Sequence, residues 1–143
     1  MMRHLTHLGG ARATLGAAVG LIALGGNERK VGLAALVANV SSHLAVQVLK
    51  RVVARPRPCD ASGRLLALVD LPDPYSFPSG HAAAATAVAA TISFAHPMLG
   101  PVLLPIATIV AVSRVRLLVH HVGDVVAGAC LGLGGAVLGQ FLL

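Results

Sequence analysis

Three clusters of polar residues interrupt an otherwise apolar chain. The first is the basic run from Lys50 to Pro58, which supplies cations on a backbone stiffened by prolines. The second, Pro78-Ser79-Gly80-His81, is typical of a helix start with Ser79 as N-cap, where free N–H groups and the positive dipole end favour an anion. The third combines Ser113-Arg114 with the segment from His120 to Asp124. There a carboxylate four residues after a histidine can fix the imidazole tautomer and leave the other ring nitrogen free as a base or nucleophile.

Together these clusters provide what metal-free phosphoryl transfer requires: fixed cations for the equatorial oxygens, an in-line nucleophile and an acid for the leaving oxygen. Each cluster also has a plainer interpretation. A basic run beside a membrane helix commonly anchors topology or lipid headgroups, and Ser79 is explained by an ordinary helix cap. The histidines and the aspartate could hold a metal ion, which the surrounding excess of Lys and Arg disfavours. A protonated histidine in a first helical turn opposes the dipole unless an anion lies between them.

The composition excludes a disordered chain and disfavours a soluble domain. Of the 143 residues, 56% are hydrophobic and 11% are charged, whereas about 25% are charged in a typical soluble domain. A bilayer core takes about 20 apolar residues per helix, so a single domain over residues 1–143 has room for roughly five or six spans. The net charge of +6 comes with one Tyr, three Phe and no Trp, which excludes nucleic acid and favours anionic lipid or phosphate as partner.

Five apolar stretches are predicted to be transmembrane helices, because backbone groups in lipid must find their hydrogen bonds within the segment. They cover residues 5–25, 31–49, 79–96, 98–118 and 124–143. The first stretch lacks a small-residue cleavage site, so we expect a retained helix and not a removed signal. The predicted fold class is therefore all-α, a polytopic transmembrane helix bundle. Because successive helices alternate in direction, the three polar clusters are expected on one side of the membrane.

Helix 31–49 carries a row of polar side chains that leads toward Lys50. Asn39, His43 and Gln47 recur every four residues and share one face. Polar side chains in hydrocarbon are costly, so this face should point into the bundle or into a wet cavity. The row either forms interhelical hydrogen bonds or lines a substrate groove.

Glycine pairs at four-residue spacing allow helices to approach closely. These pairs are Gly16 with Gly20, Gly128 with Gly132 and Gly135 with Gly139. In so alanine- and glycine-rich a chain they favour packing inside the bundle, and a homodimer through these faces is the alternative.

The three clusters resemble the signature of the type 2 phosphatidic acid phosphatase (PAP2) superfamily, which includes lipid phosphate phosphatases and vanadium haloperoxidases. That signature reads Lys, six residues, Arg-Pro; then Pro-Ser-Gly-His; then Ser-Arg, five residues, His, three residues, Asp. The matching positions are Lys50, Arg57-Pro58, Pro78 to His81, Ser113-Arg114, His120 and Asp124. The spacing gives no family role to the neighbouring residues Arg51, Arg55, Arg116 and His121.

The resemblance implies a metal-independent phosphatase that needs no cofactor. His120 would be the nucleophile and form a phosphohistidine, Asp124 would orient it, and His81 would protonate the leaving alkoxide. The phosphate oxygens would be held by Lys50, Arg57, Ser79, the Gly80 amide and Arg114.

One geometric condition follows from the helical repeat. On an unbroken helix Arg114 would align with His121 and not with His120, so helix 98–118 must end or bend between them. Gly123 is the predicted hinge. Membrane members of the family commonly have six spans, and five are counted here.

The expected substrate is a lipid-linked phosphate that diffuses in laterally from the bilayer. The resemblance implies as candidates polyprenyl phosphates or diphosphates, phosphatidate, phosphatidylglycerophosphate and a decaprenylphosphoryl-phosphoribose type of lipid. The Lys and Arg in the short loops predict a multi-pass protein of the cell (inner) membrane with its site on the cytoplasmic face. Two other classes are a non-enzymatic lipid or anion transporter that uses the same cations and a structural membrane module.

Overall fold

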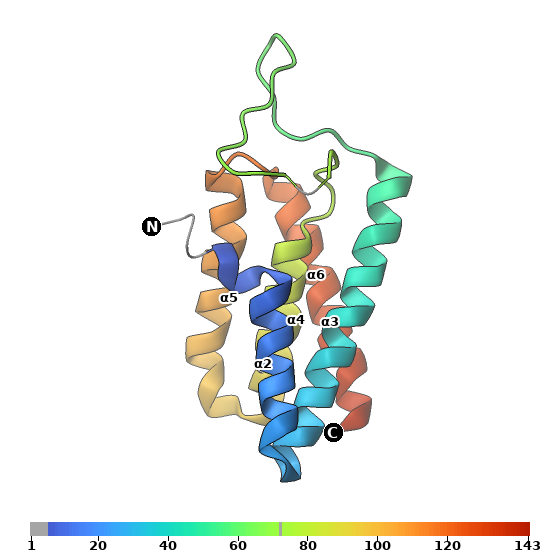
Figure 1. Cartoon of the computed structure of the whole chain (residues 1–143), viewed down its shortest axis with the longest axis vertical. Coiled ribbons are helices and arrows are strands. Elements are labelled where there is room, and N and C mark those ends of the chain that lie inside the picture. The colour runs from blue at the N-terminus through green and yellow to red at the C-terminus, as the bar shows by residue number, and fades with distance from the viewer. Residues whose placement is uncertain (1–5, 72) are drawn as a thin grey trace.

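A computed structural model describes residues 6–71 and 73–143, and within them the chain is a bundle of five α-helices (Figure 1). The helices are α2 (Ala11–Leu24), α3 (Gly26–Val53), α4 (Gly80–Ala95), α5 (Gly100–Arg116) and α6 (Val122–Gly139). Short 3₁₀ segments add η1 (Thr6–Gly9), η2 (Pro97–Leu99) and η3 (Gln140–Leu142). The all-α fold class is thereby confirmed.

The first, second and last helices differ most from their expected bounds. The first α-helix begins at Ala11, after the 3₁₀ segment η1, and not at residue 5. The second helix runs from Gly26 to Val53 over 28 residues, longer at both ends than 31–49. Gly25 alone separates it from α2, and its φ of 77° suits glycine at so abrupt a reversal. The last helix begins at Val122 with His121 as N-cap, so Gly123 lies inside α6 and the prediction of a hinge there is wrong.

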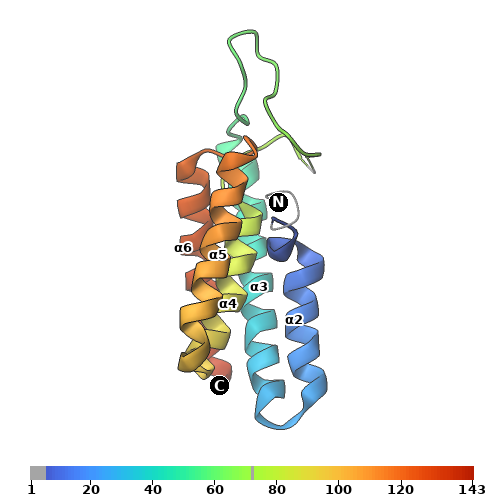
Figure 2. The same ribbon diagram turned by 90° about the vertical axis from the view of Figure 1, so that its left-hand side faces the viewer.

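Three segments are long and apolar enough to cross a membrane, namely Gly26–Val53, Pro97–Arg116 and Val122–Gly139. Helices Ala11–Leu24 and Gly80–Ala95 are apolar and shorter. The shorter α4 lies at the centre, in contact with α3, α5 and α6 (Figures 1 and 2). Its buried residues are mostly alanines, which let the neighbouring helices approach from several sides.

The glycines of α6 face the interior of the bundle. A Cβ at Gly128 or Gly132 would collide with backbone carbonyls of Ser79 and Ala83, at and just after the start of α4. At Gly135 and Gly139 it would collide with backbone of α3. These two glycine pairs therefore cannot supply a dimer face, because they are already used inside the chain.

The remaining glycine pair lies on α2, where Gly16 and Gly20 meet nothing within 4 Å. Of the three glycine pairs, this one alone leaves a surface on which a homodimer is still predicted.

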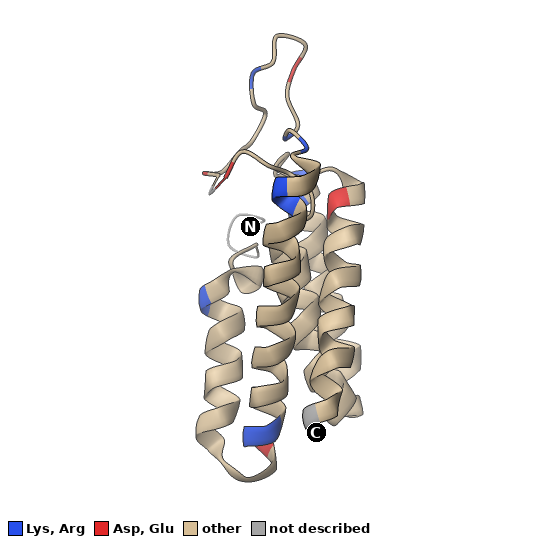
Figure 3. Cartoon of the chain, turned by 90° about the vertical axis from the view of Figure 1, so that its right-hand side faces the viewer, with Lys and Arg blue, Asp and Glu red and all other residues tan. Residues whose placement is uncertain are grey.

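The long segment between α3 and α4 and the short one between α5 and α6 lie at the same end of the bundle (Figures 1 and 2). Alternating helix directions thus bring the ends of α3 and α5 and the starts of α4 and α6 together there. Lys and Arg also concentrate at this end, and a second small group lies near the start of α3 (Figure 3).

Candidate active site

A cavity of about 420 Å³ lies at this end of the bundle. Its lining includes six of the eight predicted catalytic and phosphate-binding residues: Lys50, Arg57, Gly80, His81, Arg114 and His120. The other two, Ser79 and Asp124, are fully buried. The tertiary structure thus gathers residues from four helices and two connecting segments around one space.

Ser79 joins the start of α4 to the start of α6. Its backbone N–H donates to the carbonyl oxygen of Asp124 at 2.8 Å, and its Oγ accepts from the backbone N–H of Ala82 at 3.4 Å. Ser79 is therefore an ordinary N-cap in this structure, as the sequence predicts. Gly80 follows it at the cavity wall, where a Cβ would lie 3.7 Å from the Val46 side chain.

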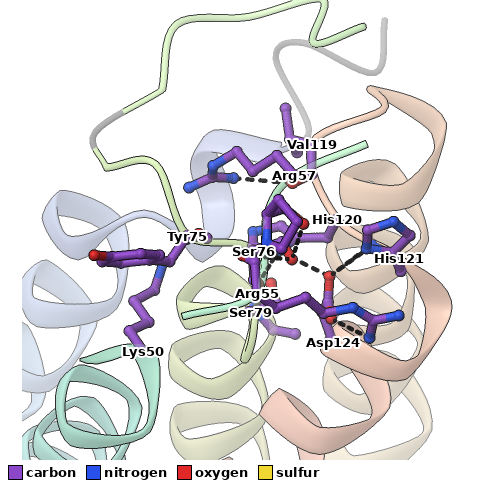
Figure 4. A network of polar contacts seen from close by, with 12 residues as sticks. Lys50, Arg55, Arg57, Tyr75, Ser76, Ser79, Val119, His120, His121 and Asp124 are labelled. Carbon is purple, nitrogen blue, oxygen red and sulfur yellow. Dashed lines mark hydrogen bonds and ion pairs between the residues drawn. The ribbon is translucent and has the colours of Figure 1, made fainter. Parts of the chain in front are cut away.

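The chain turns sharply between Arg114 and His120, where the sequence predicts an end or a bend of the helix. α5 ends at Arg116, and Leu118 has a positive φ of 56°. The turn is held from the long loop, since Arg57 Nη1 donates to the carbonyl oxygen of Val119 at 2.9 Å (Figure 4). The bend therefore lies at residues 117–121, upstream of Gly123.

His120 is oriented by a backbone carbonyl. Its Nδ1 lies 2.6 Å from the carbonyl oxygen of Ser76, and the side chain is buried with 4% of the residue exposed (Figure 4). A carbonyl only accepts, so Nδ1 carries the proton and the neutral ring keeps Nε2 as its unprotonated nitrogen. Burial and the charges of Arg57 and Arg114 lower the pKa of His120 to about 3, although the Ser76 carbonyl opposes this. The imidazole is therefore neutral and nucleophilic at neutral pH.

The carboxylate of Asp124 lies closer to His121 and Arg55 than to His120. Its Oδ2 accepts from the backbone N–H of His121 at 2.7 Å and lies 3.2 Å from Nδ1 of the same residue. Its Oδ1 accepts from Arg55 Nη1 at 3.0 Å, whereas His120 Nδ1 is 3.8 Å from Oδ2 (Figure 4). In this structure the carbonyl oxygen of Ser76 orients His120. The hydrogen bond expected from His120 to Asp124 is replaced by a longer electrostatic contact of 3.8 Å.

Arg55 and His121 consequently have a structural task that the family spacing did not assign to them. They hold the buried carboxylate at the start of α6 and so fix the turn that carries His120.

Arg114 retains unused hydrogen-bonding capacity. Its Nη1 donates to the Thr6 hydroxyl at 2.7 Å, whereas Nε is buried without a partner among the described residues. A buried guanidinium N–H without an acceptor is costly, so this atom suits an anionic ligand in the cavity that Arg114 lines.

The polar row on α3 lines the same cavity. Asn39 Nδ2 donates to the Thr14 hydroxyl on α2 at 3.0 Å, and Nε2 of Gln47 lies 3.3 Å from Nε2 of His43. The structure thus contains both arrangements predicted for the row. Asn39 forms an interhelical hydrogen bond, and Asn39, His43 and Gln47 all line the cavity. Apolar side chains continue the wall beside them: Leu15, Val40, Leu44 and Ala84.

Three residues of the site were missed in the sequence: Thr6, Asp73 and Ser76. Asp73 binds both Lys50 and Arg57, with Oδ1 2.8 Å from Lys50 Nζ and 3.2 Å from Arg57 Nη2. Asp73 and Ser76 lie in an irregular loop, which has no periodicity that would reveal a buried face. Thr6 precedes the first helix and gives no chemical signal of its own.

Over the described ranges, 6–71 and 73–143, no group of three or more His, Cys, Asp or Glu is placed to hold a metal ion. The cations around His120 are instead suited to a phosphate.

Comparison with known proteins finds a matching family and similar proteins over most of the chain. Residues 31–139 match the PAP2 superfamily. The decaprenylphosphoryl-5-phosphoribose phosphatase of Mycobacterium tuberculosis is 38% identical over 116 residues, which are 81% of this chain and 63% of that protein. The undecaprenyl-diphosphatase of Sulfolobus acidocaldarius is 35% identical over 73% of this chain and 51% of its own. The chain thus spans less than two thirds of these relatives.

Two crystal structures share the fold. The PAP2 type phosphatidylglycerolphosphate phosphatase from Bacillus subtilis is 29% identical, with a TM-score of 0.76 over 98% of this chain and 73% of that one. Aquifex aeolicus LpxE has a TM-score of 0.85 over 98% of this chain and 83% of its own, at 22% identity. With its motif residues gathered around one cavity and its sequence matched from residue 31 to 139, this chain belongs to the PAP2 superfamily.

Proposed function

We propose that the protein is an integral-membrane phosphatase that hydrolyses a lipid-linked phosphate through a phosphohistidine on His120, without a metal ion. The observation that carries this proposal is the state of His120: its Nδ1 is engaged by Ser76, and its ring lines a cavity with three cationic side chains. A neutral imidazole beside fixed cations suits nucleophilic attack on a phosphate, because the cations stabilise the charge on the equatorial oxygens.

In the first step, Nε2 of His120 uses its lone pair to form an N–P bond while the bond from phosphorus to the lipid oxygen breaks. His81, in the first turn of α4, donates a proton to the departing alkoxide. Lys50, Arg57 and Arg114, with the Gly80 amide, hold the phosphoryl oxygens. In the second step, water attacks phosphorus, gives its proton to His81 and breaks the N–P bond, which releases inorganic phosphate.

Asp124 acts on this cycle through its charge and its position. The carboxylate lies 3.8 Å from Nδ1 of His120, close enough to stabilise the positive ring that forms on phosphorylation. It also fixes the turn from Val119 to Val122 through His121 and Arg55.

The lining of the cavity supports a lipid phosphate as the substrate class. Its polar end holds the cations, and its wall continues along α2 and α3 past Leu15, Val40 and Leu44. A phosphate headgroup with an apolar chain fits such a wall. The two curated relatives are named for a decaprenylphosphoryl-phosphoribose and an undecaprenyl diphosphate. We therefore propose a polyprenyl-linked phosphate, with the phosphoribose type first among the candidates.

The test is phosphate release by the detergent-purified protein in the presence of a chelator. The panel comprises decaprenylphosphoryl-phosphoribose phosphate, undecaprenyl phosphate and diphosphate, phosphatidate and phosphatidylglycerophosphate. We expect release from at least one polyprenyl lipid, unaffected by chelation. Release that stops on chelation and returns with a divalent metal would overturn the metal-free mechanism, and no release from any lipid would overturn the phosphatase proposal.

The lowered pKa of His120 has a consequence for the pH dependence of the rate. An ordinary histidine becomes protonated, and loses its nucleophilic lone pair, as the pH falls through 6.5. Burial and Arg57 lower the pKa of His120 to about 3, so the loss occurs only near that pH. We expect kcat/KM, expressed per concentration of substrate dianion, not to fall between pH 7 and pH 5. A decline with an apparent pKa near 6.5 would contradict this state of His120.

The active site is proposed to face the cytoplasm, in the cell (inner) membrane. The site end of the bundle carries more Lys and Arg than the opposite end, where Arg29 and Lys30 lie near the start of α3 (Figure 3). Cys59, exposed in the long loop, reports the side directly once Cys130 is changed to Ser. A membrane-impermeant maleimide should label Cys59 in inverted vesicles and not in intact spheroplasts, and the reverse pattern would place the site outside.

A further inference from the structure

The Asp73 carboxylate binds two of the cations that are proposed to hold the phosphate of the substrate. Its two carboxylate oxygens lie 2.8 and 2.9 Å from Lys50 Nζ, and Oδ1 also accepts from Arg57 Nη2 at 3.2 Å. The residue lines the cavity together with Arg114 and His120. A carboxylate and a phosphate offer the same kind of anionic oxygens to Lys and Arg. An internal anion thus holds two of the three cations that the proposed reaction needs.

The hydrogen bonds of Lys50 leave no donor for a substrate phosphate while the Asp73 carboxylate is bound. An ammonium group has three N–H donors. Two are directed at Asp73 Oδ1 and Oδ2, and the third donates to the carbonyl oxygen of Tyr75 at 3.0 Å. Lys50 therefore has no donor left for a substrate while Asp73 remains in place.

Arg57 is placed differently. Its Nε and Nη1 donate to the carbonyl oxygens of Asp73 and Val119, which fix the guanidinium against the backbone. Only Nη2 binds the Asp73 carboxylate. Departure of this carboxylate would free Lys50 and one edge of Arg57 and leave Arg57 anchored.

We propose that Asp73 is an internal competitor for the phosphate subsite, which the phosphate of the substrate displaces from Lys50 and Arg57 and which returns when inorganic phosphate leaves. This inference rests on the proposed function, because it takes Lys50 and Arg57 as phosphate-binding cations. In the empty site the single negative charge of Asp73 reduces the repulsion between the two cations Lys50 and Arg57. During turnover its return weakens the hold on the product and limits product inhibition.

The chain contains its own reporter of this displacement. Tyr75 is the single tyrosine, and there is no tryptophan. Its backbone N–H donates to Asp73 Oδ1 at 3.0 Å and its carbonyl oxygen accepts from Lys50. Displacement of Asp73 breaks the first contact and frees the Lys50 side chain that makes the second, so tyrosine emission should change when inorganic phosphate is added to the wild-type protein.

The experiment is a titration of the full-length, detergent-purified protein with inorganic phosphate, followed by calorimetry and tyrosine fluorescence. Asp73→Asn keeps the shape of the side chain and removes its charge. Asp60→Asn is the matched control, because Asp60 lies in the same loop and its carboxylate binds Ser62 and Arg64, whereas the described lining of the cavity does not include it. Asp73→Ser serves as a second variant if the first is unstable.

We expect Asp73→Asn to lower the Kd for phosphate by about three- to tenfold and to raise inhibition by phosphate in parallel, while Asp60→Asn leaves both unchanged. An unchanged or higher Kd would overturn the inference, because Asp73 would then position Lys50 and not compete with the ligand. Constant tyrosine emission through saturation of the wild type would also overturn it. If neither the wild type nor any variant binds phosphate, the proposed function itself fails.

Discussion

His120→Ala is expected to lower the rate of phosphate release by at least about 10⁴-fold, because it removes the atom that accepts the phosphoryl group. The measurement is steady-state release from whichever polyprenyl lipid is the best substrate. Trapping adds a direct test: after an alkaline quench, ³²P from labelled substrate should remain on the wild-type protein and not on the variant.

The neighbouring His121 provides the matched control. It contacts the same carboxylate, with Nδ1 3.2 Å from Asp124 Oδ2, and is partly exposed. His121→Ala should cost only about tenfold, since the backbone N–H of residue 121 still donates to Asp124. Equal losses in the two variants would show that both histidines act by holding the turn. If neither the wild type nor His120→Ala hydrolyses the lipid and both transport a lipid or an anion, the result would favour a non-enzymatic transporter.

His81→Ala is expected to slow release from a lipid phosphate by about 10²- to 10³-fold, as for the loss of a general acid. The reason is specific to the leaving group. A lipid alkoxide needs a proton as the P–O bond breaks, whereas 4-nitrophenolate leaves readily without one. The variant should therefore retain much more of its activity toward 4-nitrophenyl phosphate than toward the lipid, and the ratio of the two rates is the measurement.

His96→Ala is the control for this variant. His96 follows α4 at the other end of the bundle, where its Nε2 lies 3.1 Å from Glu28 Oε2. The substitution His96→Ala should leave the rates with both substrates unchanged. Equal loss toward the lipid and the aryl phosphate in His81→Ala would contradict a proton-donating role and assign His81 to binding or packing.

The sequence by itself determined the fold class and predicted most of the polar residues that the structure brings around one cavity. Long apolar stretches leave the backbone no partners in lipid other than its own, so helices were the only outcome that the pattern allowed. Motif spacing then selected Arg57, Arg114 and His120 from among similar neighbours, and the helical repeat required a break after Arg114. The structure has that break, in the turn at residues 117–121.

Only the tertiary structure decided which groups hold the reactive ones. The partners of His120 and Lys50 are a carbonyl and a carboxylate from an irregular loop, Ser76 and Asp73, far from them in sequence. Loops carry no hydrophobic period, so their contacts cannot be inferred from spacing. Similarly, Asp124 pairs with Arg55 because the end of α3 lies beside the start of α6 in the folded bundle. Local sequence fixes where helices begin and end, whereas hydrogen bonds between distant segments depend on how those helices pack.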